Sequence, residues 1–223
     1  MDNSSYHLLN VGDIAMLQVA VERLNRLWPD ATIEVITERP DLLAEYCPAA
    51  MPLIPQGRQW FHRRHLFGRF SRFVTKQREL KLKCQWPRAA QRLFNWKARL
   101  KGRKNQKDVN HFLEAVFDAD LVVASGGGYM TDAFKSHAVP ILGELKTATR
   151  MGKYAVMFGQ GIGPICDPEL RAKVAWVLPS VDLIAVRESR TGLPLLNSLG
   201  VKRDRVIATG DDAIELVYRA RST

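Results

Sequence analysis

The residues best suited to chemistry begin with a run of three glycines followed by a carboxylate. Gly126, Gly127 and Gly128 come directly after an apolar run, and Asp132 follows shortly after them. Backbone without side chains lets a ligand approach closely, and its free N–H groups can donate to an anion. The same glycines would also suit a tight turn. Asp132 would suit a helix cap, a partner for sugar hydroxyls, or a general acid or base.

A second glycine-rich stretch runs from Phe158 to Pro164 and also follows an apolar, strand-like run. Neither stretch is a nucleotide fingerprint. No Gly-Lys-Ser/Thr ends a phosphate-binding loop, and Pro164 stands where the dinucleotide pattern needs its last glycine. The chain has no Gly-x-Ser-x-Gly elbow, which argues against a hydrolase of that kind. Because Pro164 stiffens the loop after Gly163, we expect Gly161 and its neighbours to form a rigid wall of a ligand crevice.

Asn10-Val11-Gly12-Asp13 stands at the start of a helical pattern. An aspartate in this position can cap backbone N–H groups, or it can offer its carboxylate to a ligand near the positive end of the helix. The motif therefore predicts a cap, a ligand contact through Asn10, Gly12 and Asp13, or both.

Arg187 ends a strand-like run, which predicts a place at the carboxyl edge of the sheet beside the glycine stretches. Its planar guanidinium suits a small dianion carrying carboxylate or phosphate. A structural salt bridge with Glu188 or Asp182 is the alternative. Asp211 and Asp212 end the last α/β unit and would serve as caps or as supporting partners.

The elements that must position these groups alternate regularly. Apolar residues at helical spacing alternate with short β-branched runs, and such alternation predicts a parallel sheet covered on both faces. The sequence thus predicts an α/β fold with a Rossmann-like, doubly wound sheet. Strands are expected at 33–37, 121–124, 154–158, 183–187 and 205–208, and helices at 13–28, 42–46, 112–117, 140–150, 168–178 and 192–199.

One strand is missing from this pattern. Only Tyr6-His7-Leu8-Leu9 precedes the first helix, and it is short and weakly apolar for a buried strand. Either the first strand is abbreviated or the chain begins inside the first loop, and we favour the loop.

Positive charge is concentrated in one segment. The chain carries 33 Lys and Arg residues and a formal net charge of +10. Residues 57–107 hold 17 of those basic residues against the single acid Glu79, so the remainder is mildly acidic. We expect a basic, aromatic-rich helical insertion over 57–107, and one Rossmann-like domain formed by 1–56 and 108–223.

Aromatic residues are interleaved with the charges of this insertion, and two amphipathic helices are expected there. Such a segment suits an anionic membrane surface or an anionic glycan, or single-stranded nucleic acid, which we favour least. Alternatively, its aromatics dock on the domain core and its charges are solvated. The two helices would carry Leu66, Phe67, Phe70, Phe73 and Val74, and Ala89, Leu93, Trp96 and Leu100.

Composition limits the remaining classes. A chain of 223 residues that is 46% hydrophobic can bury a core. Cys47, Cys84 and Cys166 are odd in number and widely spaced, which favours free thiols in a reducing compartment. His62 and His65 have no acidic or cysteine ligand nearby, so we expect no metal and no cofactor. Without a signal peptide or membrane span, we expect a cytoplasmic protein that contacts membrane only at the surface.

Taken together, five motifs resemble the polysaccharide pyruvyl transferase family in order and rough spacing. The resemblance covers residues 4 to about 217, apart from 57–107, and departs mildly at Thr191, usually Ser, and at Asp212, often Pro. The motifs are Asn10-x-Gly12-Asp13; Gly126-Gly127-Gly128 with Asp132; Gly159-Gln160-Gly161-Ile162-Gly163-Pro164; Val186-Arg187-Glu188; and Gly210-Asp211-x-Ala213.

The resemblance implies one half of a glycosyltransferase-B-like architecture, with the reaction in a cleft between two halves. It implies transfer of pyruvate from phosphoenolpyruvate, as a ketal, to a sugar of a cell-surface or lipid-linked glycan. Much of the family's donor pocket comes from the second half, so we expect a truncated chain or a non-catalytic glycan-binding remnant if these residues are everything. Asp132 and Asp13 would then act on acceptor hydroxyls or in proton transfer. The substrate-binding residues would be Asn10, Gly12, Gly126, Gly127, Gly128, Gly161, Arg187 and Glu188.

Overall fold

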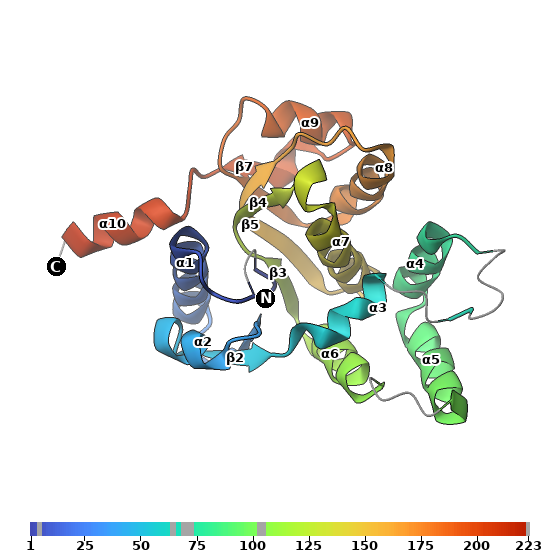
Figure 1. Cartoon of the computed structure of the whole chain (residues 1–223). Coiled ribbons are helices and arrows are strands. Elements are labelled where there is room, and N and C mark those ends of the chain that lie inside the picture. The colour runs from blue at the N-terminus through green and yellow to red at the C-terminus, as the bar shows by residue number, and fades with distance from the viewer. Residues whose placement is uncertain (4–5, 63–65, 68–73, 102–105, 222–223) are drawn as a thin grey trace.

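The structure, a computed structural model, describes residues 1–3, 6–62, 66–67, 74–101 and 106–221. Its centre is a parallel sheet of five strands with helices on both sides (Figure 1). This confirms the predicted Rossmann-like α/β fold. The strands of this sheet are β3 (Leu121–Ala124), β4 (Gly127–Met130), β5 (Tyr154–Ile162), β6 (Leu183–Val186) and β7 (Val206–Ala208).

The sheet order is β3, β5, β6, β7, and β4 pairs with β5 beyond the end of β3. A separate parallel pair is formed by β1 (Ile33–Ile36) and β2 (Ala50–Leu53). The sequence pattern missed β2 because Pro52 lies within it. Proline is tolerated in a strand at a sheet edge, where its missing N–H is not needed.

Residues 1–3 occupy the position of the missing first strand, so the expectation that the chain begins inside the first loop is wrong. The N–H of Asp2 donates to the Val123 carbonyl at 2.8 Å, and the Ser125 N–H donates to the Asp2 carbonyl at 2.7 Å. On the other side, the Ile36 N–H donates to the Met1 carbonyl at 3.0 Å. Three residues thus join the two sheets, too few to show a strand period in the sequence.

Two hydrophobic cores lie on opposite faces of the sheet, because successive strand residues point to opposite sides. Val122, Ala124, Ala155 and Met157 belong to one core, and Val123 and Val156 pack in the other. The first is covered by α6 (Gln106–Asp118), α7 (Lys135–Arg150), α8 (Pro168–Val177) and α9 (Gly192–Ser198); the second by α1 (Val11–Leu27) and α2 (Pro40–Tyr46), with α10 (Ala213–Arg221) against α1.

The basic segment contributes α3 (Gln59–His62), α4 (Lys76–Gln85) and α5 (Pro87–Lys101). Trp60, Phe61 and Phe94 are buried in the first core, whereas Trp86 and Trp96 are exposed. Docking on the domain core is therefore confirmed for Trp60, Phe61 and Phe94, whereas binding of an anionic partner by the exposed aromatics stays a prediction. The predicted helix over 66–74 lies mainly outside the described residues, as does His65.

Arg58, in the basic segment, is buried between two acids. Its Nε donates to Glu144 Oε1 at 2.7 Å, and its Nη2 pairs with Asp2. Its guanidinium also lies over the Tyr6 ring, 4.7 Å from the centroid. Burial raises the pKa of Glu144 to about 8, with the charge of Asp2 adding to the shift and Arg58 opposing it. One cation is therefore shared by two buried carboxyl groups, and that of Glu144 holds its proton through neutral pH.

This cluster predicts a pH-dependent stability. Because the folded pKa of Glu144 lies above its ordinary value, the folded protein holds a proton that the unfolded chain has released between about pH 5 and pH 8. We expect the free energy of unfolding to fall as pH rises through this window, by up to about 1.4 kcal/mol per pH unit. Urea titrations across the window should show that slope in the parent and lose it in Glu144→Gln. The exposed Glu45→Gln is the control, and an unchanged slope in Glu144→Gln would contradict the prediction.

Candidate functional site

The strand order places a topological switch point beside the loop that leads into α1. With residues 1–3 included, the chain proceeds outward in one direction through β1 and β2, and in the other through β3, β5, β6 and β7. Connections on the two sides of such a switch point leave toward opposite faces, which opens a ligand crevice at the carboxyl ends of the strands. The loop before α1 and the turn after β3 lie on the two sides of this switch point.

Asn10, rather than Asp13, caps α1. Its side-chain oxygen accepts from the N–H groups of Gly12 at 2.9 Å and Asp13 at 3.3 Å. Asp13 lies in the first turn, half-buried, where the positive end of the helix favours its carboxylate. The sequence analysis allowed Asp13 both to cap the helix and to offer its carboxylate to a ligand. In the structure Asn10 caps the helix, which leaves the carboxylate to Asp13.

The two glycine stretches form paired strands, and only Ser125 and Gly126 make a bend, between β3 and β4. Gly127 and Gly128 therefore belong to a strand rather than to the tight turn that the triple glycine suggested. β4 contains Gly127 and Gly128, and β5 continues through Gly159 and Gly161 to Ile162. Gly127 pairs with Gln160, and the register shifts along both neighbours of β5. The two strands lie close together here: a Cβ on Gly161 would be in ordinary van der Waals contact with the Gly128 Cα, at 3.5 Å. Gly128 itself is exposed, so bare backbone faces outward here.

Gly126 and Gly159 are needed for close packing under this surface. A Cβ on Gly126 would lie 2.6 Å from the Met16 Sδ of α1. Gly159 has φ +56°, and its Cβ would lie 2.5 Å from Asp212 Oδ2. The buried Asp212 accepts from Arg23 of α1 at 2.6 Å. The second glycine stretch therefore packs directly against the loop before α10.

Gly159→Ala should destabilise the protein by at least about 1–2 kcal/mol, because alanine resists the left-handed conformation and displaces Asp212. Chemical denaturation measures this. The matched control is Gly128→Ala, which has no neighbour within 4 Å of the added Cβ, and we expect a change within about 0.5 kcal/mol. Equal stabilities of the two variants would contradict the assignment.

Arg187 lies at the carboxyl edge of the sheet and joins these parts. Its Nε donates to the Gly159 carbonyl at 2.8 Å, and its Nη2 donates to the Met16 Sδ at 2.9 Å. Its ion-pair partner is Asp211, at 3.4 Å from Nη1 to Oδ2, rather than either acid named from the sequence. The side chain remains 27% exposed. Its charge is loosely paired, so an incoming anion could compete for it.

Glu188 caps α9. It accepts from the Thr191 hydroxyl at 2.6 Å and from the N–H groups of Thr191 and Gly192 at 3.0 and 2.9 Å. These bonds, that of the Thr191 side chain foremost, lower the pKa of Glu188 to about 2. Both carboxylate oxygens of Glu188 thus already have hydrogen-bond partners. Its contact with substrate stays a prediction.

Asp132 holds the loop that leads into α8. Its two carboxylate oxygens accept from the backbone N–H groups of Cys166 at 2.7 Å and Asp167 at 3.0 Å. Asp132 also lines a cavity of about 450 Å³ between the basic segment and the starts of α7 and α8. A proton-transfer role remains a prediction for the side of the carboxylate that faces this cavity.

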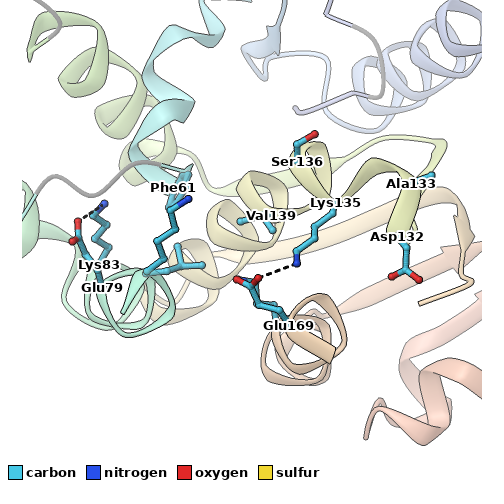
Figure 2. Close-up of a pocket in the computed structure, with 12 residues that line it drawn as sticks. Phe61, Glu79, Lys83, Asp132, Ala133, Lys135, Ser136, Val139 and Glu169 are labelled. Carbon is cyan, nitrogen blue, oxygen red and sulfur yellow. Dashed lines mark hydrogen bonds and ion pairs between the residues drawn. The ribbon is translucent and has the colours of Figure 1, made fainter. Parts of the chain in front are cut away.

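The cavity is lined by four lysines and three acids, and several of these charges form ion pairs (Figure 2). Lys135 lies between the Asp132 end and the Glu79 end, and its Nζ donates to Asp167 and Glu169 at 2.9 Å each. At the far end, the buried Lys83 pairs with Glu79 at 2.9 Å. The lining residues are Phe61, Lys76, Glu79, Leu80, Lys83, Asp132, Ala133, Lys135, Ser136, Val139, Glu169 and Lys173.

The sequence missed His137, in the first turn of α7. Its ring stacks on Tyr6, with centroids 5.0 Å apart, and its Nε2 lies 3.2 Å from the Asn3 carbonyl. Burial lowers the pKa of His137, while the charges of Asp2 and Asp13 oppose the shift. The imidazole is therefore neutral at neutral pH. One sequence signal could have pointed to His137, namely its place five residues after Asp132, at the start of a helix that follows a strand.

Within the described ranges, no group of three or more His, Cys, Asp or Glu side chains is arranged to hold a metal ion. None of the helices in the described part of the chain combines the length and hydropathy that crossing a bilayer requires. All three cysteines are free, and burial raises the pKa of Cys47 to about 11 and that of Cys84 to about 12.

Comparison with known proteins agrees with the motifs. The family model described as polysaccharide pyruvyl transferase matches residues 10–222, nearly the whole chain. No curated protein and no solved structure gives a significant match. The family match supports a pyruvyl transferase role in polysaccharide biosynthesis, with a pyruvate donor and a glycan acceptor in general terms. The chain belongs to the polysaccharide pyruvyl transferase family.

Proposed function

We propose that the protein transfers pyruvate from phosphoenolpyruvate to a sugar of a cell-surface or lipid-linked glycan, forming a cyclic ketal. The observation that carries this proposal is the meeting of the family motifs at one sheet edge, beside the switch point. Gly128 and Gly161 offer bare backbone there, and Arg187 offers a loosely paired cation. The reaction would take place at the cytoplasmic face of a membrane, where a lipid-linked acceptor is held.

The proposed reaction needs no oxidant or metal in its balance. The methylene carbon of phosphoenolpyruvate gains a proton, and the neighbouring carbon becomes cationic. Two acceptor hydroxyls form bonds to that carbon and lose their protons, while its bond to the phosphate oxygen breaks. One proton is thus returned to the methyl group and the other leaves with phosphate.

The chain's own groups can be assigned to these needs. Arg187 would hold the carboxylate or phosphate of the donor, since a guanidinium stabilises such charge in a site that excludes water. Asp132 and Asp13 would orient the acceptor hydroxyls or accept their protons. His137, neutral and close enough to Asp13 to feel its charge, is the further group suited to proton transfer.

The test is a transfer assay with phosphoenolpyruvate and free or lipid-linked glycans. It should use this chain and also a version extended downstream in its reading frame. Release of phosphate, together with an acid-labile pyruvate ketal on the glycan detected by mass spectrometry, is the expected result. Calorimetric binding of glycan without turnover would favour a non-catalytic glycan-binding protein instead. Product and binding from neither version would contradict the proposal.

A further inference from the structure

Helix α5 is anchored to the protein by one face only. Ala90, Phe94 and Ala98 are buried along that face, and the Phe94 ring meets Trp60 edge-to-face with centroids 5.4 Å apart. The helix contacts α4 and α6 and lies at the margin of the molecule (Figure 1). These buried residues differ from the apolar set that the helical spacing predicted, which is Ala89, Leu93, Trp96 and Leu100.

That predicted apolar set faces outward. Leu93, Trp96 and Leu100 fall within about 60° of one another around the helix, at 100° per residue, and their exposed fractions are 37%, 60% and 69%. Trp86, directly before the helix, is 62% exposed. These four residues form the outward stripe of α5. An exposed stripe of this kind costs free energy in water unless it meets an apolar partner.

Basic side chains line this stripe. Arg88, Arg92 and Arg99 fall within about 40° of one another beside it, and all three are exposed. No acidic residue occurs anywhere in α5. The face therefore combines apolar insertion with positive charge, which is the pattern of a helix lying in the interface of an anionic bilayer. Tryptophan favours that depth, because its ring is apolar and its N–H can reach the headgroups.

We propose that the outward stripe of α5 and its three arginines dock the protein on an anionic lipid surface. A second copy of this chain fits less well, because a symmetric contact would bring the arginines of both copies together. Single-stranded nucleic acid would stack on Trp86 and Trp96 but would leave Leu93 and Leu100 without a partner. The inference deepens the proposed function by placing the protein beside a lipid-linked acceptor, and it rests on that function only for the acceptor.

Vesicle co-sedimentation of the full chain, without donor or glycan, tests the docking separately from catalysis. We expect binding to phosphatidylcholine vesicles that contain phosphatidylglycerol and little binding to phosphatidylcholine alone. Trp96→Ser should weaken binding by at least about tenfold, and Arg92→Gln with Arg99→Gln by about fivefold for each charge. Matched controls are Trp28→Ser, 53% exposed at the end of α1, and the exposed pair Arg26→Gln with Arg150→Gln; neither should change binding.

Several outcomes would overturn this inference. These are absent or equal binding to the two kinds of vesicle, unchanged binding in the α5 variants, or equal losses in the controls. Association of the protein with itself that Trp96→Ser abolishes, without vesicle binding, would assign the stripe to a second copy. Binding to single-stranded DNA but not to vesicles would assign it to nucleic acid. Circular dichroism of each variant confirms that the fold is retained, and a transfer assay without product leaves the vesicle result standing.

Discussion

Arg187→Met should lower kcat/KM for phosphoenolpyruvate by about 10²–10³, the usual loss when one preorganised group that stabilises developing negative charge is removed. Arg187 contacts both the second glycine stretch, through the Gly159 carbonyl, and α1, through Met16. It therefore ties β5 to α1 while part of its side chain stays exposed. Steady-state kinetics with varied donor concentration measures the effect.

A structural role of Arg187 must be separated from donor binding. Loss of its two hydrogen bonds should cost about 1–2 kcal/mol of folding stability, which chemical denaturation reports independently of activity. Arg190→Met is the matched control, because Arg190 is exposed three residues further along the same connection. A folded Arg187→Met protein with the parent's kinetics and donor affinity would rule out the assigned role.

Arg58→Met should destabilise the protein by about 3–5 kcal/mol near pH 8, because it leaves the buried carboxyls of Asp2 and Glu144 without their cation. The loss should shrink at acidic pH, where Glu144 is protonated and no longer needs the cation. Urea denaturation at the two pH values measures the difference. The cluster joins three distant parts of the chain, because Arg58 lies in the basic segment, Asp2 near the N-terminus and Glu144 in α7.

The control for this prediction lies in the same segment. Arg88 is exposed and approaches Asp118 only to 4.0 Å, so Arg88→Met should change stability by no more than about 1 kcal/mol. Arg58→Met combined with Glu144→Gln should recover part of the loss, since one of the two uncompensated acids is then removed. If Arg58→Met stays within 1 kcal/mol of the parent, the buried cluster does not contribute as we describe.

The sequence predicted those elements whose local period is strong. Helix α1 and strands β3 and β6 were placed to within about two residues. It failed where the local signal was ambiguous. The sequence predicted a helix that begins at Pro140, because proline is common at helix starts. In the structure α7 begins at Lys135 and contains Pro140 in its interior. β5 runs past its predicted end at residue 158, through Gly159 and Gly161, because β4 pairs with it there.

For the site, the sequence determined which chemical groups exist and that strand ends would gather them. Only the tertiary structure decided what each group contacts. Arg58 meets Glu144 from 86 residues away, and His137 meets Asn3 from 134 away. Neither pairing leaves a local pattern, because the contact is set by packing across the sheet. The same holds for α5: its spacing specified an apolar stripe, and only packing on α4 and α6 decided that the stripe faces outward.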